Sequence, residues 1–286
     1  MAQRKPMLSP IVGLKGVVVG IANMVPGVSG GTIAVLLGLY DELMEAFGAF
    51  FSSEGGWRRN LLFLLPVVVG VVIGTIGFAR IIGFLLANYP LQTNLFFVGL
   101  IVGSLPHLVR HIDRSVVRRR PVLSAGLFVV GAMSVLLMGL ADSPSATMPL
   151  TDTSTRTLLI ILLAAVVSSF ALVIPGLSGS FILLLLGLYT TMQTAFSTPN
   201  WTLVGVFVLG NLIGIALIAR AIHWLLRRFH SLTYCVIIGL VLGSIASLWQ
   251  PLSADPEGFL AMAAGLAGII SAWLLGGSRP GKARSA

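Results

Sequence analysis

The chain has 286 residues, of which 56% are hydrophobic and only 9% are charged, and its formal net charge is +9. Soluble domains carry about 25% charged residues, so this composition excludes an ordinary soluble protein and is typical of a membrane protein. Nucleic-acid binding would need the basic residues on one water-exposed face, whereas here they lie between apolar segments. Because Cys235 is the only cysteine, the chain has no intramolecular disulfide and no cysteine-based metal site.

Near the N-terminus, Arg4 and Lys5 precede an apolar stretch as basic residues do in a signal peptide. Lys15 interrupts this stretch and no convincing cleavage site follows, so we expect it to be retained. Apolar segments then recur along the chain, several of them reaching the roughly 18 residues that a membrane-spanning helix needs. They are predicted at residues 11–40, 61–87, 95–109, 122–141, 157–196, 203–226, 232–249 and 258–276.

The first and fifth segments are interrupted by the same polar motif. Residues 24–40 read MVPGVSGGTIAVLLGLY and residues 173–189 read VIPGLSGSFILLLLGLY, at an offset of 149. Further matches follow at an offset of 140, and they pair Gly70 with Gly210, Gly74 with Gly214, Arg80 with Arg220, and residues 99–104 with 239–244. The offset changes in the polar stretch 41–60, which we expect to be a loop. The sequence therefore predicts two copies of one unit.

We predict an all-α polytopic membrane protein made of two repeats within a single integral membrane domain, residues 1–286. Repeat 1 spans residues 10–141, repeat 2 spans residues 157–276, and a tail follows at residues 277–286. Each repeat would contain a broken helical hairpin and three transmembrane helices. Only about eight clearly apolar residues follow the first break, too few to span a membrane, which favours a re-entrant hairpin over two full spans.

Most basic residues fall in loops that would share one side of the membrane. These residues are Arg4, Lys5, Arg58, Arg59, Arg110, Arg114, Arg118, Arg119, Arg120, Arg227, Arg228, Arg279, Lys282 and Arg284. The positive-inside rule places them in the cytoplasm, together with both termini. Because each repeat would cross the membrane three times, an odd number, the second repeat would be inverted relative to the first.

The two breaks are candidate sites for a polar ligand, because broken backbone at membrane depth must be buried in protein or line a wet cavity. Close packing of small residues is the alternative explanation. Proline opposes continuation of a helix, glycine permits close approach of a ligand, and the next helix would present N–H groups suited to an anion such as phosphate. The candidate residues are Asn23, Pro26, Gly27, Ser29, Gly30, Gly31, Thr32, Pro175, Gly176, Ser178, Gly179 and Ser180.

Arg80 and Arg220 each lie about seven residues inside an apolar segment. An arginine near the membrane centre costs at least ~2.5 kcal/mol, so something should compensate the charge. Snorkelling of the side chain to the interface is one explanation. The repeated position favours the other, a guanidinium that binds two oxygens of a phosphate.

Four further residues are candidates for an entrance or for ion coupling. Lys15 is either an interfacial anchor or a phosphate contact. Asp41 and Glu42 follow the first hairpin and are either solvated or able to carry a coupling proton. His223, one turn after Arg220, is either interfacial or able to titrate near neutrality. The coupling ion, a proton or another, stays open.

The motifs PGVSGGT and PGLSGS, each leading into LLGLY, resemble the family catalogued as domain of unknown function 368. Members of that family are implicated as polyprenyl-phosphate transporters of the PopT type. The resemblance covers nearly the whole chain. It implies a protein of the bacterial inner membrane that returns undecaprenyl phosphate from the outer to the cytoplasmic leaflet. It carries over to the Pro, Gly and Ser positions of the two breaks, and not to Arg80 or Arg220.

Two other functions stay open. A small-anion channel or secondary transporter would also use broken helices. A membrane prenyl-phosphate phosphatase would need a nucleophile and an acid–base partner, and the four histidines show no recognisable catalytic spacing. We therefore predict a transporter rather than an enzyme, with no catalytic residue, no metal site and no cofactor.

Overall fold

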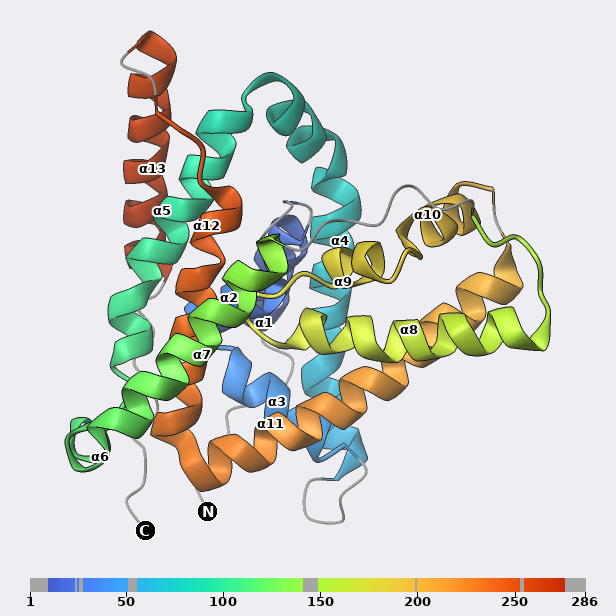
Figure 1. Ribbon diagram of the computed structural model, residues 1–286, viewed down its shortest axis with the longest axis horizontal. Coiled ribbons are helices and arrows are strands. Elements are labelled where there is room, and N and C mark those ends of the chain that lie inside the picture. The colour runs from blue at the N-terminus through green and yellow to red at the C-terminus, as the bar shows by residue number, and fades with distance from the viewer. Residues whose placement is uncertain are drawn as a thin grey trace.

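The computed structural model describes residues 10–23, 25, 28–50, 56–140, 149–198, 200–252 and 255–275. Within these ranges every regular element is a helix (Figure 1). The helices are α1 (Pro10–Ala22), α2 (Gly30–Leu36), α3 (Tyr40–Gly48), α4 (Trp57–Asn88), α5 (Pro90–Val109), α6 (Arg114–Arg119), α7 (Pro121–Leu140), α8 (Thr155–Val173), α9 (Gly179–Leu185), α10 (Tyr189–Ser197), α11 (Trp201–Gly243), α12 (Ile245–Leu248) and α13 (Pro256–Leu275).

Six of the described helices are long and apolar enough to cross a membrane, namely α4, α5, α7, α8, α11 and α13. The pair α9 and α10 passes the same test together but is bent by 117°, as in a broken span or a re-entrant loop. Large apolar side chains such as Ile76 and Leu274 point outward, 74% and 79% exposed. Apolar surface of this kind faces lipid rather than water, so the chain is a multi-pass helical membrane protein.

Helix α1 packs along α4, and α8 packs along the first part of α11, through small residues at equivalent positions. A Cβ atom added to Gly74 would lie 2.1 Å from the carbonyl oxygen of Val17, and one added to Gly214 would lie 2.5 Å from that of Val166. These partners are related by the same two offsets as the sequence motifs. Backbones approach this closely only where a side chain is missing.

The remaining long helices pair across the two predicted repeats. Helix α5 packs along α13, where a Cβ on Gly99 would lie 2.0 Å from the carbonyl oxygen of Gly265 (Figure 1). The second part of α11 packs along α7, where a Cβ on Gly239 would lie 2.1 Å from the carbonyl oxygen of Phe128. The last helix of each predicted repeat thus contacts a helix of the other one.

The backbone repeats the same irregularities at the same offsets. Tyr89, between α4 and α5, has φ −135° and ψ 53°, and Phe229, where α11 bends, has φ −136° and ψ 46°. Gly38 and Gly187 follow the two short helices with φ of 64° and 69°. The described parts of the two halves therefore share local geometry as well as sequence.

One sequence-based prediction about the fold was wrong. Residues 41–60 were expected to form a loop, but α3 covers Tyr40–Gly48. Its apolar residues recur at helical spacing, so Tyr40, Leu43, Met44 and Ala46 are buried on one side of the helix while polar residues occupy the other. Helix α3 packs against α11, and this tertiary contact stabilises a segment that is too polar to be recognised from composition.

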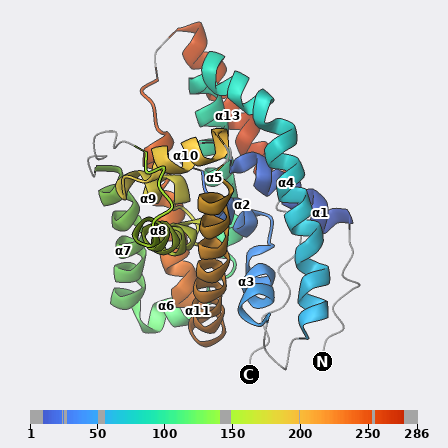
Figure 2. The ribbon, with the colours of Figure 1, turned by 90° about the vertical axis from the view of Figure 1, so that its right-hand side faces the viewer.

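The two short helices after the breaks differ in burial. Every residue of α2 is buried, and α2 lies in the middle of the molecule between the α1–α4 pair and α7 (Figure 2). In α9 only Gly179 and Leu183 are buried. The first break therefore leads into the core of the protein, while the second lies beside its surface.

Candidate functional site

The helix breaks occur where the sequence motif predicts them. Helix α1 ends at Ala22, and α2 begins after Ser29, whose Oγ accepts a hydrogen bond of 3.2 Å from the N–H of Gly31. Pro26 and Gly27 lie outside the described residues. Helix α8 ends at Val173, Pro175 and Gly176 are buried, and α9 begins after Ser178. Gly176 has φ 84°, a conformation that side-chain-bearing residues rarely adopt.

The two breaks contact each other directly. The N–H of Gly176 donates to Thr32 Oγ1 at 2.8 Å, and Ser29 Oγ donates to the carbonyl oxygen of Ile174 at 3.4 Å. A Cβ on Gly31 would lie 2.8 Å from the carbonyl oxygen of Val173. Segments separated by nearly 150 residues thus form one polar centre, in which Ser29 and Thr32 already have backbone partners.

Equivalent residues cover the first turn of each short helix. A Cβ on Gly30 would lie 2.3 Å from Asn23 Oδ1, and one on Gly179 would lie 3.0 Å from the side chain of Leu172. Asn23 therefore lies against the start of α2, where an amide can bond to a polar ligand or to water. In the second half the same place is apolar.

The hydroxyl groups of the second break are more accessible. Ser178 Oγ and Ser180 Oγ lie 2.8 Å apart, Ser178 is half-buried, and Ser180 is exposed. The side chain of Ser178 makes no capping bond to α9. Both α2 and α9 have only seven residues, so few peptide dipoles are aligned behind either break. Hydroxyl and amide groups, rather than helix dipoles, must supply most of the polarity.

The structure does not bring the two predicted arginines into contact with the breaks. Arg80 and Arg220 are both exposed, nine residues before the irregular residues Tyr89 and Phe229 respectively. No hydrogen bond or ion pair joins either guanidinium to a break within the described ranges. The end of α3 covers the backbone of Arg220, because a Cβ on Gly48 would lie 3.1 Å from its Cα. A phosphate-binding role for the arginines stays a prediction.

Lys15 has a partner inside the protein. Its Nζ donates to the carbonyl oxygen of Leu37 at 2.6 Å, at the C-terminal end of α2. A cation at this end of a helix satisfies a free carbonyl group and complements the helix dipole. The bond therefore gives Lys15 a part in holding α2 in place, a role that neither sequence-based alternative included.

Asp41 belongs to a polar cluster that the sequence did not reveal. Its Oδ1 accepts a 2.8 Å hydrogen bond from the hydroxyl of Tyr234. The Tyr234 ring stacks on His111 at 4.6 Å and lies 4.8 Å from the ring of His230. These residues come from α3, the loop after α5, and α11, so no local spacing could have predicted their contact. Of the other two candidates, Glu42 is exposed and His223 is half-buried.

A groove of about 620 Å³ lies beside the second break, between α8, α9, α10 and α11. We call it the second-half groove. Most of its wall is apolar, with side chains such as Leu183 and Phe207. Its polar side chains are Ser168, Ser180, Tyr189, Gln193 and Asn211. Only Ser180 among these was predicted, because isolated polar residues in apolar helices carry no pattern that marks them as lining one cavity.

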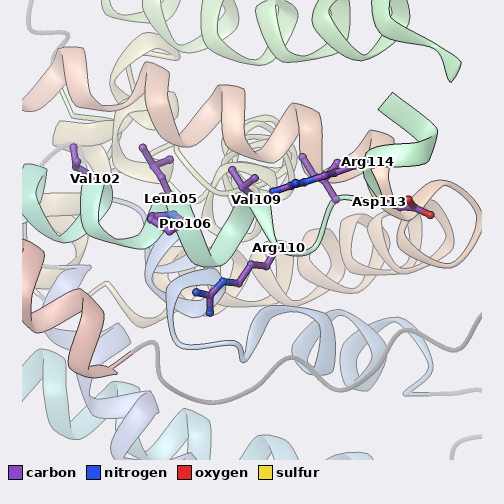
Figure 3. Close-up of a pocket in the computed structure, with 8 residues that line it drawn as sticks. Val102, Leu105, Pro106, Val109, Arg110, Asp113 and Arg114 are labelled. Carbon is purple, nitrogen blue, oxygen red and sulfur yellow. The ribbon is translucent and has the colours of Figure 1, made fainter. Parts of the chain in front are cut away.

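A wider hollow of about 960 Å³ lies at the basic end of α5 (Figure 3). Val102, Leu105 and Val109 line it from α5, and Arg110, Asp113 and Arg114 lie around the following turn. The N–H of Ser115 donates to Asp113, which lowers the pKa of that carboxyl. The carboxylate therefore stays charged at neutral pH and offsets part of the positive charge of the arginines.

The packed apolar helices, the two breaks and the contact between them define the class of protein. The chain is a multi-pass helical membrane protein of the broken-helix type, the architecture from which many secondary transporters are built. A family model described as VCA0040-like, undecaprenyl phosphate translocase-like, matches residues 19–256, and the chain belongs to this family. The family resemblance based on the two motifs is thereby confirmed.

Two curated relatives are similar over most of their length. The chain is 33% identical over 247 residues to a polyprenyl-phosphate transporter of Vibrio cholerae, covering 82% of this chain and 76% of the relative. It is 29% identical over 252 residues to a polyprenyl-phosphate transporter of Staphylococcus aureus, covering 85% and 87%. No solved structure matches the chain.

Proposed function

We propose that this protein carries undecaprenyl phosphate from the outer to the cytoplasmic leaflet of the bacterial inner membrane. Membership of the family and the names of both relatives support transport of a polyprenyl phosphate. The structural observation that carries the proposal is the contact between the breaks, through Thr32 and Gly176. In transporters with internal repeats, broken helices meet at the binding site near the membrane midplane.

The chemistry of the substrate supports this arrangement. A charged head group must cross about 30 Å of hydrocarbon, in which a charged side chain costs at least ~2.5 kcal/mol. The prenyl chain can stay in lipid during the crossing. The protein needs to supply polar groups for the head alone, and a polar centre inside apolar helices supplies them. The break residues and the two arginines remain our proposed head-group contacts, with Asp41, Glu42 and His223 as candidates for proton coupling.

An inverted arrangement of the two halves would give both leaflets access to this centre. The matching contacts of Gly74 and Gly214 support two equivalent halves. The distribution of basic residues supports inversion, with both termini in the cytoplasm. Alternating exposure of the two breaks would then move the head group without a chemical reaction, so the protein acts as a carrier and not as an enzyme.

Reconstituted liposomes test the proposal. The purified protein is placed in vesicles that contain labelled undecaprenyl phosphate, and leaflet exchange is measured with and without pH gradients of either sign. We expect exchange well above that of protein-free vesicles, with no release of phosphate. Exchange at the protein-free rate under every gradient would refute the carrier function. Flux of small anions in its place would identify a channel, and release of phosphate would identify a phosphatase.

A further inference from the structure

We propose that the second-half groove binds the phosphate head and the first isoprene units of the carried lipid, with Asn211 and Ser180 as head-group contacts. This inference rests on the proposed function and names a binding site within it. The volume of about 620 Å³ lies within the range of about 300–1,000 Å³ that small-molecule sites occupy. The groove also begins at the second break, since Gly179 and Ser180 form part of its wall.

Four of the five polar side chains of the groove occur in the second half alone, and the fifth, Tyr189, is matched by Tyr40. At the other four positions the first half has residues without a polar side chain, and the pairs are Val19 with Ser168, Gly31 with Ser180, Met44 with Gln193, and Val71 with Asn211. In the first half Val19 and Met44 are 7% and 3% exposed, in the packed core. Two copies of one unit have therefore diverged at four positions that line a single cavity, which points to a ligand and not to packing.

Asn211 is the most informative of these residues. Its Nδ2 donates to the carbonyl oxygen of Phe207 at 2.9 Å, while its Oδ1 is buried without a partner in the described structure. A buried acceptor without a donor is costly, and native proteins usually satisfy it. Asn211 lines the groove, and a small rotation of its amide would expose Oδ1 to a ligand there, which can then provide the missing donor.

A phosphate monoester fits this acceptor. Its second pKa is about 6, and burial among apolar groups favours the less charged form. The monoanion keeps one P–OH group, which donates to Asn211 Oδ1, while the hydroxyl of Ser180 donates to a phosphate oxygen. None of the side chains that line the groove is charged, which agrees with a head group that enters with its charge reduced.

The rim of the groove fits the prenyl chain. Leu172, Phe196 and Leu212 surround the opening and are 44%, 56% and 61% exposed. Side chains with this exposure on apolar helices face lipid, so the groove opens sideways into the membrane. A lipid can therefore place its head against Asn211 while most of its chain stays in the bilayer.

The test is photolabelling of the purified full-length protein in nanodiscs. The probes are a polyprenyl phosphate with a diazirine near its head and a polyprenol of the same chain length. We expect the phosphate probe to label peptides of α9 and α11 that line the groove. Inorganic phosphate should not compete, because it lacks the chain. Labelling confined to the hollow at Arg110 and Arg114, or competition by inorganic phosphate, would overturn the proposal.

The variants copy the first half into the second. Asn211→Val reproduces Val71, and Ser180→Gly reproduces Gly31. Each should bind the phosphate probe about tenfold more weakly, because a hydrogen bond to a charged group is lost, and should bind polyprenol within twofold of the wild type. The control Asn88→Val removes the same kind of bond, from Asn88 Nδ2 to the Phe84 carbonyl oxygen at 2.8 Å, at the end of α4.

The result also separates the groove from the transport function. Wild-type exchange in liposomes together with unchanged phosphate binding in both groove variants would overturn the groove and leave the carrier standing. Labelling of the groove by a protein that shows no exchange would support the site and refute the carrier. Ser180→Gly keeps the test decisive if Asn211→Val fails to fold.

Discussion

At the scale of single residues, the centre of the molecule depends on one hydrogen bond between distant segments. The Thr32 side chain is 2% exposed and accepts from the buried N–H of Gly176. Ser29 adds a second bond, to the carbonyl oxygen of Ile174. These side chains connect the two breaks, so their loss should affect stability and transport together.

Replacement of Thr32 tests this connection. Thr32→Val keeps the shape but leaves the Gly176 N–H unpaired, which should cost about 1–3 kcal/mol of folding free energy. Thr32→Ser keeps the oxygen and should remain near wild type. Thermal unfolding of the purified proteins in detergent measures the difference. Equal midpoints for Thr32→Val and Thr32→Ser would show that the bond does not stabilise the centre.

The arginines and the second break allow a further prediction at this scale. Arg220→Ala and Ser178→Ala should each lower leaflet exchange about tenfold, because each removes a proposed bond to the charged head group. Both variants should insert in the membrane at wild-type levels. Arg227→Ala, which removes an exposed charge about two turns further along α11, is the control. Normal exchange in both test variants would place the head-group site elsewhere.

At the scale of helices, glycines set the distance between neighbours. Gly74 faces the Val17 carbonyl on α1, whereas Gly77 on the same helix has open space around it. A glycine that permits close contact is required, but a glycine in open space only lowers helix propensity. The two positions are three residues apart, so they differ in environment and hardly in depth.

Alanine at each position should therefore have opposite effects. Gly74→Ala places a Cβ 2.1 Å from a backbone oxygen, so α1 must move away and the unfolding midpoint should fall by several degrees. Gly77→Ala should leave the midpoint unchanged or raise it, because alanine favours the helix over glycine by up to about 1 kcal/mol. Thermal unfolding of the two purified variants measures this difference. An equal fall of the midpoint in both variants would contradict the packing argument.

At the scale of the whole molecule, the two halves share contacts but differ in exposure. Both carry the same helix pairs and the same irregular backbone at Tyr89 and Phe229. The first half places α2 in the core, and α3 packs against α11, whereas α9 and α10 border an open groove. In this conformation the first break is therefore the more tightly packed of the two, and the second is the more open to a ligand.

The proposed inversion of the two halves predicts the side on which each loop lies. In a Cys235→Ser background, a cysteine at Leu252 should react with a membrane-impermeant maleimide added outside intact cells. A cysteine at Arg118 should react only after the cells are opened, because the basic helix α6 would be cytoplasmic. The reverse pattern would invert the whole topology, and reaction of both from outside would refute an odd number of crossings between them.

The sequence by itself determined the membrane class, the two breaks and their repetition, because apolar length, proline and duplicated motifs are local or periodic signals. It also gave the positions of the glycine pairs, which follow the same offsets. Only the tertiary structure decided that the breaks touch, that Lys15 bonds to the Leu37 carbonyl, and that Asp41 meets Tyr234. It alone placed Asn211 in a groove with Ser180. Such contacts depend on how separate helices pack in three dimensions, and no local or periodic pattern in the sequence reveals that packing.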